Sequence, residues 1–136
     1  MDINGLSGDL TLDDVKVVTT IQGGDKGAQF GFDLLVTQTS LWVSEPAYGN
    51  LRLEQKAATG RVYEWKLGQD FPTRVVRDRV ASSSRCFYGK EVRGRFGQVL
   101  GQGDFDADGL TDVVVTSSHS SSGAASAGRV NIFYSF

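Results

Sequence analysis

The 136-residue chain is poor in the residues that cross-link, kink or catalyse: it has one cysteine, two prolines and one histidine. A lone cysteine, Cys86, cannot form an internal disulfide. No apolar run approaches the roughly 20 residues that a membrane-spanning helix needs, and residues 1–5 show neither the basic nor the apolar region of a signal peptide. The 14 basic and 16 acidic residues leave a net charge of −2, which offers no electrostatic footprint for a nucleic acid or an anionic membrane.

Candidate catalytic residues are equally scarce. His119 lies in a Ser-, Gly- and Ala-rich stretch at 117–127 that we expect to be an exposed, mobile loop. A serine, histidine and aspartate arrangement through Ser118 or Ser120 would need adjacent loop residues to hold a triad geometry, which such residues do not do. Cys86 has no base near it in the sequence, so we interpret it as a buried or incidental thiol. The sequence therefore predicts no catalytic residue.

The residues that are abundant favour strands and turns. The chain has 17 glycines, 27 Val, Ile and Thr residues, and 14 aromatic residues. Strands are predicted at 15–21, 32–37, 41–44, 61–67, 75–81, 97–101, 112–116 and 129–134, the first of them unpaired. The best helix candidate, 51–58, is short. An all-β fold is the prediction, and the apolar run 113–115, which does not alternate, predicts a strand buried on both faces.

Two sequence markers recur in the same order, which indicates an internal duplication. The Phe-Gly pair at Phe30 recurs at Phe96, 66 residues later, and the Gly-Arg-Val tripeptide at Gly60 recurs at Gly128, 68 residues later. Repeats of this length are typical of stacked supersecondary units. The chain is therefore predicted to consist of an N-terminal segment at 1–26 with one strand, a first unit at 27–92 and a second unit at 93–136.

The second unit contains a closely spaced acidic motif. Of the 16 acidic residues 12 are Asp, and four of these, Asp104, Asp106, Asp108 and Asp112, form the pattern D-x-D-x-D-G-x-x-D. Alternate carboxylates converge when the chain curls around a point, and the glycine at the sixth position permits the sharp turn. A backbone carbonyl from Leu110 at the seventh position would add a further oxygen. An oxygen-only donor set of this kind suits Ca²⁺.

Other readings of the motif are less consistent with its residues. A helix-loop-helix calcium site needs Glu at position 12, where this chain has Val115 inside an apolar run. The absence of His and Cys argues against Zn²⁺, and Mg²⁺ prefers a tighter, more hydrated shell. A solvated acidic turn would leave four carboxylates repelling one another. We therefore predict one calcium site in the loop of a strand hairpin; the first unit, with only Asp33 in the matching interval, should have none.

These residues resemble the FG-GAP repeat, the blade unit of the β-propellers of integrin α-subunits and of glycosylphosphatidylinositol-specific phospholipase D. The resemblance rests on Phe96-Gly97, the acidic loop, the run 113–115 and the tripeptide at Gly128. The Gly-Ala-Pro element of the family is replaced by Ser44-Glu45-Pro46 and Thr116-Ser117-Ser118. The resemblance implies two four-stranded antiparallel blades, with calcium ligands at Asp104, Asp106, Asp108, Asp112 and the Leu110 carbonyl. It also implies wedges between blades at Phe30 and Phe96, and an extracellular or cell-surface location.

The resulting functional hypothesis is a non-catalytic, calcium-binding propeller module for interaction or structural support. The alternative is an accessory part of a hydrolase such as that phospholipase, with the catalytic residues elsewhere. Because propellers typically have four to eight blades, two blades should belong to a larger propeller that another polypeptide, further copies or additional sequence completes. A cluster of basic residues is interpreted as a solvated strand edge rather than a partner site: Arg74, Arg77, Arg79 and Arg85.

Overall fold

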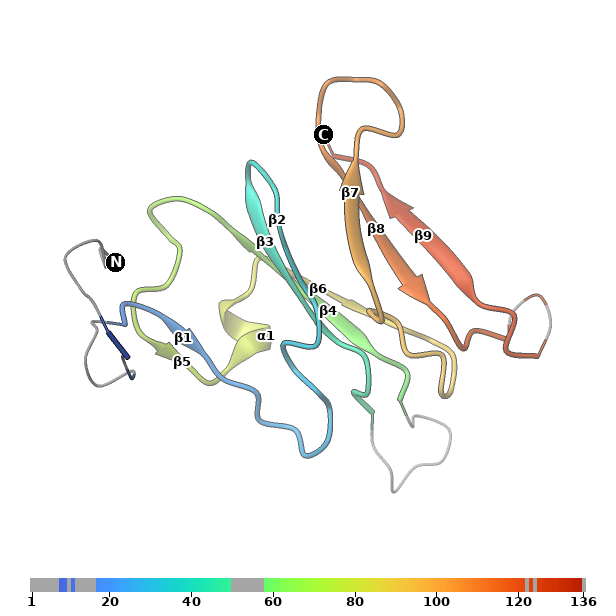
Figure 1. The fold of residues 1–136 in the computed structure, drawn as a ribbon, viewed down its shortest axis with the longest axis horizontal. Coiled ribbons are helices and arrows are strands. Elements are labelled where there is room, and N and C mark those ends of the chain that lie inside the picture. Colours follow the sequence, from blue (N-terminus) through green and yellow to red (C-terminus); the bar gives the residue numbers. More distant parts are fainter. Residues whose placement is uncertain are drawn as a thin grey trace.

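The computed structural model describes residues 8–9, 11, 17–49, 58–121, 123 and 125–135. These residues form nine strands and a single helical turn, arranged as two antiparallel sheets and a small parallel pair (Figure 1). The prediction of an all-β fold is confirmed. The candidate helix at 51–58 lies almost entirely outside the described residues. No helix among the described residues is long and apolar enough to cross a membrane.

The first sheet has four antiparallel strands in the order β2-β3-β4-β6, with bounds β2 Leu34–Val36, β3 Ser40–Glu45, β4 Arg61–Lys66 and β6 Arg85–Tyr88. The first three agree with the predicted strands to within a few residues. Strand β6 was not predicted, because four residues after a serine run show no alternation to detect. Its place is set by β4, against which Phe87 lies opposite Val62.

The second sheet has three strands, β7 Leu100–Gly103, β8 Asp112–Ser117 and β9 Arg129–Phe133, all antiparallel. Four strands were expected, and the described residues supply three. Strand β7 begins three residues later than predicted because the N–H groups of Gly97 and Gln98 both donate to the Thr116 carbonyl. This local bulge delays the regular ladder.

The N-terminal segment is paired rather than free. Strand β1, Thr20–Ile21, runs parallel to β5, Val75–Val76, so the expectation of an unpaired first strand is wrong. The strand expected at 75–81 ends at Val76, and a one-turn helix α1 follows at Arg79–Ser82. The side chain of Asp78 caps that turn by accepting the Ala81 N–H at 3.0 Å, which draws the chain out of the extended conformation.

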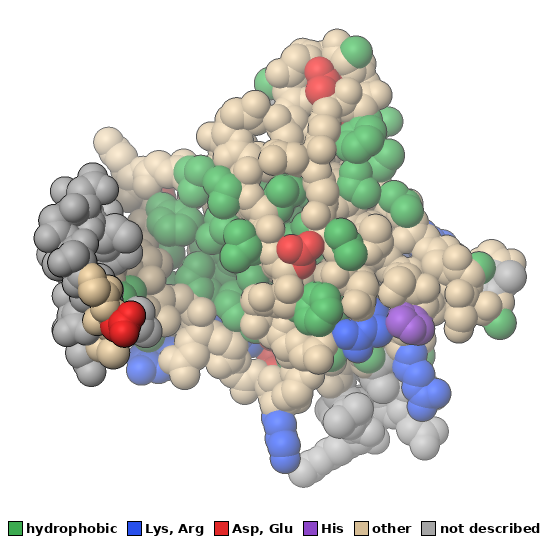
Figure 2. Space-filling model, viewed as in Figure 1, with side chains coloured by type: hydrophobic (Ala, Val, Ile, Leu, Met, Phe, Trp, Pro, Cys, Tyr) green, Lys and Arg blue, Asp and Glu red, His purple; other side chains and the backbone are tan. Residues whose placement is uncertain are grey.

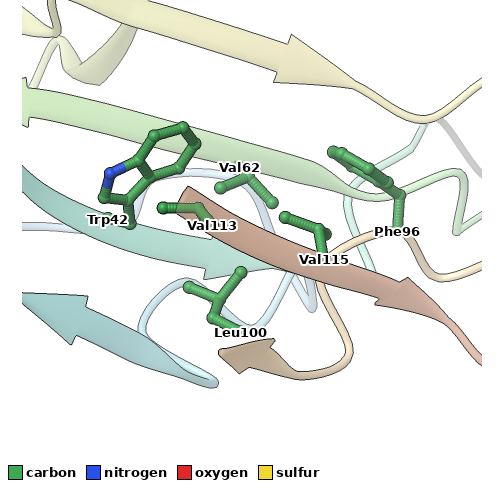
Figure 3. Packing of buried hydrophobic residues seen from close by; sticks show 6 residues of the cluster. All are labelled: Trp42, Val62, Phe96, Leu100, Val113 and Val115. Atoms are coloured by element: carbon green, nitrogen blue, oxygen red, sulfur yellow. The ribbon is translucent and has the colours of Figure 1, made fainter. Parts of the chain in front are cut away.

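An apolar core joins the two sheets, and we call it the inter-sheet core (Figure 3). Its six buried residues come from both sheets and the segment between them: Trp42, Val62, Phe96, Leu100, Val113 and Val115. The Trp42 ring stacks on Phe87 with centroids 5.5 Å apart and an interplanar angle of 10°. Phe96 belongs to this core and lies between the sheets, as the wedge interpretation predicted.

Glycine at two of the repeat markers allows the units to approach closely. A Cβ atom at Gly60 would lie 2.1 Å from the Phe96 carbonyl oxygen, and the residue has φ +87°. Gly97, at φ +98°, would place a Cβ 3.0 Å from side-chain atoms of Ser44 and Val62. Both positions need glycine for its space and its left-handed conformation. Gly60 and Gly97 thus allow close contacts between the two units.

The opposite face of the first sheet is also buried, by residues that do not belong to the inter-sheet core. Val43, Tyr63 and Trp65 form a second core there, against which Ile21 of β1 and Phe30 pack. The Phe30 ring meets Tyr63 edge-on at 5.6 Å. Phe30 is therefore a core residue that lies between the first sheet and the N-terminal segment.

An ionic network, buried at Arg61 and Glu45 and half exposed at Asp25, fastens the N-terminal segment to the first sheet. The Arg61 guanidinium donates to Glu45 Oε2 at 2.8 Å and to Asp25 Oδ2 at 2.9 Å. Arg79 donates to the same Asp25 oxygen at 2.8 Å and to the Tyr63 hydroxyl at 3.2 Å. The expectation of a solvated basic edge is wrong for Arg79, which is buried, because the network supplies acceptors that the sequence does not reveal.

One hydrogen-bonded carboxylate connects the first strands of the two sheets. Asp33 Oδ2 accepts the Leu100 N–H at 2.8 Å, and its other oxygen accepts the Leu34 N–H at 2.9 Å. Because Leu34 begins β2 and Leu100 begins β7, this side chain holds the two strands next to each other. The one aspartate in the matching interval of the first unit thus serves the packing of the sheets.

We predict that Trp42→Ala lowers the free energy of unfolding by about 3–5 kcal/mol, because it removes a buried ring from the inter-sheet core. Urea denaturation followed by circular dichroism measures the change. The control is Leu34→Ala, whose side chain is 59% exposed and which should change stability by about 0.5 kcal/mol or less. Equal losses in the two variants would contradict the assignment of the core.

Protonation of Glu64 should lower the stability of the fold in acid. Burial alone would raise its pKa, but hydrogen bonds from Arg85 at 2.6 Å and Ser40 at 2.9 Å outweigh burial, so the pKa lies below its ordinary value. A lowered pKa gives stability that is full above the unfolded-state value, about 4.3, and is lost as pH falls through the folded-state value. Unfolding measured from pH 7 to pH 2 should show a smaller acid loss in Glu64→Gln than in the parent chain.

Candidate metal centre

The acidic motif forms the loop of the β7–β8 hairpin, as predicted. Gly103 and Asp112 face each other as the last pair of the two strands, and residues 104–111 project beyond the sheet (Figure 1, orange loop). Val113 and Val115, which follow the loop, are buried in the inter-sheet core. The loop is therefore held at its base by packed strands, while its tip is exposed.

Three carboxylates converge at the tip. Oxygen atoms of Asp104, Asp106 and Asp108 all lie within 4.8 Å of one another, and all three residues are exposed. Backbone N–H groups hold the curl: those of Gly109 and Asp108 donate to the two Asp104 oxygens at 2.8 and 3.1 Å. The Leu110 N–H donates to Asp108 Oδ1 at 2.9 Å. The alternate spacing thus brings its first three aspartates together in space.

Two residues in the left-handed conformation produce this curl. Gly109 has φ +84°, as the sixth position of the motif requires, and Ala107 has φ +59°. A left-handed residue turns the chain so that successive carboxylates stay on the inside of the loop. An alanine in this conformation is strained, whereas glycine is not.

Asp112 has a different environment from the other three aspartates. It is fully buried, and its two oxygens accept the Phe105 N–H at 2.8 Å and the Ser135 N–H at 2.9 Å. The group of converging carboxylates does not include it. Asp112 ties the loop to the residues after β9, a role for which the sequence carries no signal. Its role as a ligand, like that of the Leu110 carbonyl, stays a prediction.

Two of the converging carboxylates have pKa values displaced in opposite directions. Hydrogen bonds, the strongest from the Gly109 N–H, hold the pKa of Asp104 below its ordinary value. Desolvation, followed by the hydrogen bond and charge of Asp108, raises the pKa of Asp106. Asp106 thus loses its proton at a higher pH than an isolated aspartate does, while Asp104 loses its proton at a lower one. Hard oxygen donors without His or Cys fit Ca²⁺, with water free to complete the shell.

No other part of the described chain offers a comparable cluster of metal-ligating side chains. In the first unit Asp33 accepts the Leu100 N–H, and the number of calcium sites stays a prediction. The residues weighed for catalysis show no catalytic arrangement among the described residues. His119 Nδ1 lies 3.0 Å from Ser118 Oγ on the surface, and burial raises the pKa of the Cys86 thiol, which disfavours the reactive thiolate.

The serine-rich stretch is only partly the exposed loop that was expected. Ser117 ends β8 and is buried, and Ser120 is buried with its hydroxyl donating to Glu91 Oε2 at 2.7 Å. The Ser121 N–H donates to the same oxygen at 2.7 Å. These contacts come from Glu91, which is 29 and 30 positions away from the two serines, so composition alone could not reveal them.

Comparison with known proteins identifies one repeat. Residues 96–133 match the FG-GAP repeat. The matched region begins at Phe96, includes the whole acidic loop and ends at Phe133, the last residue of β9. No curated protein matches the chain. The second unit is thus an FG-GAP repeat, and the narrower likeness to the propeller of the phospholipase stays a prediction.

We predict that Gly109→Ala lowers the free energy of unfolding by about 1–2 kcal/mol, because a Cβ atom is strained at φ +84° although the space around it is open. Ala107→Gly is the matched control, since the same conformation is already occupied there by alanine. It should change stability by about 0.5 kcal/mol or less, because relief of strain is offset by the entropy of the unfolded glycine. Thermal or urea unfolding without added metal measures both variants.

Proposed function

We propose that the chain is a non-catalytic, calcium-binding pair of β-propeller blades that serves as an interaction or structural module. The observation that carries the proposal is the convergence of Asp104, Asp106 and Asp108 in the hairpin loop of an FG-GAP repeat. Ca²⁺ would perform no chemistry here. Its charge would offset the repulsion between the carboxylates and stiffen the β7–β8 hairpin.

The loop is placed so that this stiffening would reach beyond the hairpin. The buried Asp112 joins the loop at the Phe105 N–H to the end of the second sheet at the Ser135 N–H. A cation that orders residues 104–108 would therefore also restrain the residues after β9. This coupling supports a structural role for the metal.

The second sheet has an apolar face that supports an interaction role. Val99, Val130 and Ile132 are 52%, 63% and 43% exposed. The pairing of β8 with β9 places Ile132 beside Val114 on one face of the sheet. Val113 and Val115 point to the other face, toward the inter-sheet core. Figure 2 shows exposed hydrophobic side chains in several patches, including the area below the acidic loop. Another polypeptide or further copies would cover such a face in a complete, extracellular or cell-surface propeller.

Calcium titration tests the proposal. Isothermal calorimetry should show one binding event, and at a hundredfold excess over the Kd calcium should stabilise the fold by about 2.7 kcal/mol relative to chelator. Mg²⁺ at the same concentration should have a smaller effect. Absence of both heat and a melting shift with Ca²⁺ would contradict the proposal.

Substitutions of single aspartates test whether calcium binds at the acidic loop. Asp104→Asn and Asp106→Asn should each weaken calcium binding by about tenfold or more, because each replaces an anionic oxygen donor. Asp70→Asn, on an exposed turn away from the loop, is the matched control and should leave binding unchanged. An equal effect of the control would show that calcium acts through the general charge of the chain.

A further inference from the structure

Two buried arginines converge on a single carboxylate oxygen of the N-terminal segment. The guanidinium groups of Arg61 and Arg79 both donate to Asp25 Oδ2, at 2.9 and 2.8 Å. The two arginine side chains are 5% and 7% exposed, whereas that of Asp25 is 50% exposed. Arg61 begins β4 and Arg79 begins α1, while Asp25 follows β1. The donors are therefore built into the fold, and their acceptor reaches them from the surface.

Other contacts hold both guanidinium groups in place. Arg61 donates to Glu45 Oε2 at 2.8 Å and lies over the Tyr48 ring, with 3.6 Å between its Cζ atom and the ring centroid. Arg79 donates to the Tyr63 hydroxyl at 3.2 Å. Planar guanidinium groups that are fixed in this way present a preformed set of donors to an oxyanion. Preformed donors lower the entropic cost of binding.

The charges around the two guanidinium groups leave a place for one anion. The buried Glu45 supplies one negative charge, and its Oε1 atom accepts no hydrogen bond from the described residues, since the nearest Arg79 nitrogen lies 3.6 Å away. Arg61 and Arg79 together carry two positive charges, so one of these remains. Because a buried charge without a partner is costly, an anion has to occupy this place. In the structure that anion is the carboxylate of Asp25.

An open hollow gives solvent access to the same guanidinium groups. It has a volume of about 510 Å³, and the charged residues of its lining are Asp25, Arg61, Arg77, Asp78 and Arg79. Without Asp25 this lining would hold three arginines and one aspartate, and that aspartate caps α1 through a backbone N–H. A volume of this size accommodates an oxyanion together with a small attached group.

A two-residue strand attaches the segment that carries Asp25. The N–H groups of Thr20 and Gln22 donate to backbone carbonyls at β5, and the Gln22 carbonyl accepts from Arg79 at 2.8 Å. Ile21 packs against the second core. A pairing this short opens locally at a low free energy, because few hydrogen bonds are lost. Asp25 can therefore leave the guanidinium groups while the two antiparallel sheets stay folded.

We propose that Arg61 and Arg79 form a binding site for the carboxylate or phosphate group of a ligand, and that Asp25 is the internal ligand that closes it. The ligand oxyanion takes the place of Asp25 on the two guanidinium groups, and residues 20–25 move away. A tethered carboxylate competes at a high effective concentration, so the site is inhibited by its own chain until that segment opens. The inference goes beyond the proposed calcium role and does not rest on it.

Removal of the internal charge should open the site. Asp25→Asn keeps the size of the side chain, so the variant should bind inorganic phosphate or acetate at least tenfold more tightly than the parent chain does. Both anions are titrated into the isotope-labelled full chain in metal-free buffer, with NaCl keeping the ionic strength constant, and the Nε signals of Arg61 and Arg79 are followed by NMR. The anion that binds more tightly identifies the class of oxyanion. Equal affinities in the variant and the parent, or no shift at these two arginines, would overturn the proposal.

Chemical rescue tests the site with a matched control. Asp25→Ala leaves space where the carboxylate was, so acetate should restore part of the thermal stability that this variant loses, and chloride at the same ionic strength should not. Asp78→Ala is the control, because Asp78 lines the same hollow but accepts a backbone N–H. Acetate should not rescue it. Equal rescue of the two variants, or equal rescue by chloride, would contradict a site at the guanidinium groups.

Hydrogen exchange tests whether Asp25 holds the segment. In Asp25→Asn the amides of Thr20 and Gln22, which are bonded to β5, should exchange at least tenfold faster than in the parent chain. The amide of Tyr63, in the centre of the first sheet, should keep its protection. Unchanged exchange at Thr20 and Gln22 would overturn the role of Asp25 as a closing ligand. An equal acceleration at Tyr63 would show unfolding of the sheet in place of opening of the segment, and would overturn it as well.

Discussion

The contact between the two sheets is the constraint on which the rest of the structure depends. Each sheet presents apolar residues that must leave water, and the inter-sheet core brings Trp42 and Val62 of one against Val113 and Val115 of the other. Phe96 fills the space where the units join, and Gly60 makes room for its backbone. The hydrogen bond from Leu100 to Asp33 then sets β2 beside β7. Gly60 of the first unit and Phe96-Gly97 of the second are therefore parts of one interface.

The same interface holds the base of the candidate calcium loop in place. Asp104, Asp106 and Asp108 are exposed and would repel one another, yet Val113 and Val115 anchor the strand that follows them. Asp112 is buried at the boundary, where its oxygens satisfy backbone donors of the loop and of Ser135. A rigid base with a charged, exposed tip is the arrangement in which a cation can order a loop without being needed for the core.

The two sheets differ in how their remaining surfaces are covered. The first sheet buries its second face beneath Phe30 and the N-terminal segment, which Arg61 and Arg79 tie down through Asp25. The second sheet leaves Val130 and Ile132 exposed on its second face. The two sheets thus differ in how much apolar surface the described residues cover, and the exposed face of the second sheet is what supports the proposed interaction role.

Short-range patterns in the sequence were enough to determine the all-β fold, the repeat at residues 96–133 and the hairpin that holds the acidic motif. The spacing of Asp104, Asp106, Asp108 and Gly109 predicted their convergence, because a curl of a few residues depends on local conformation alone. The tertiary structure alone decided the burial of Arg79, the place of β6 and the link from Asp33 to Leu100. These features depend on groups brought together from distant positions, and no local pattern encodes which acceptor a buried arginine will meet or which strand a short segment will join.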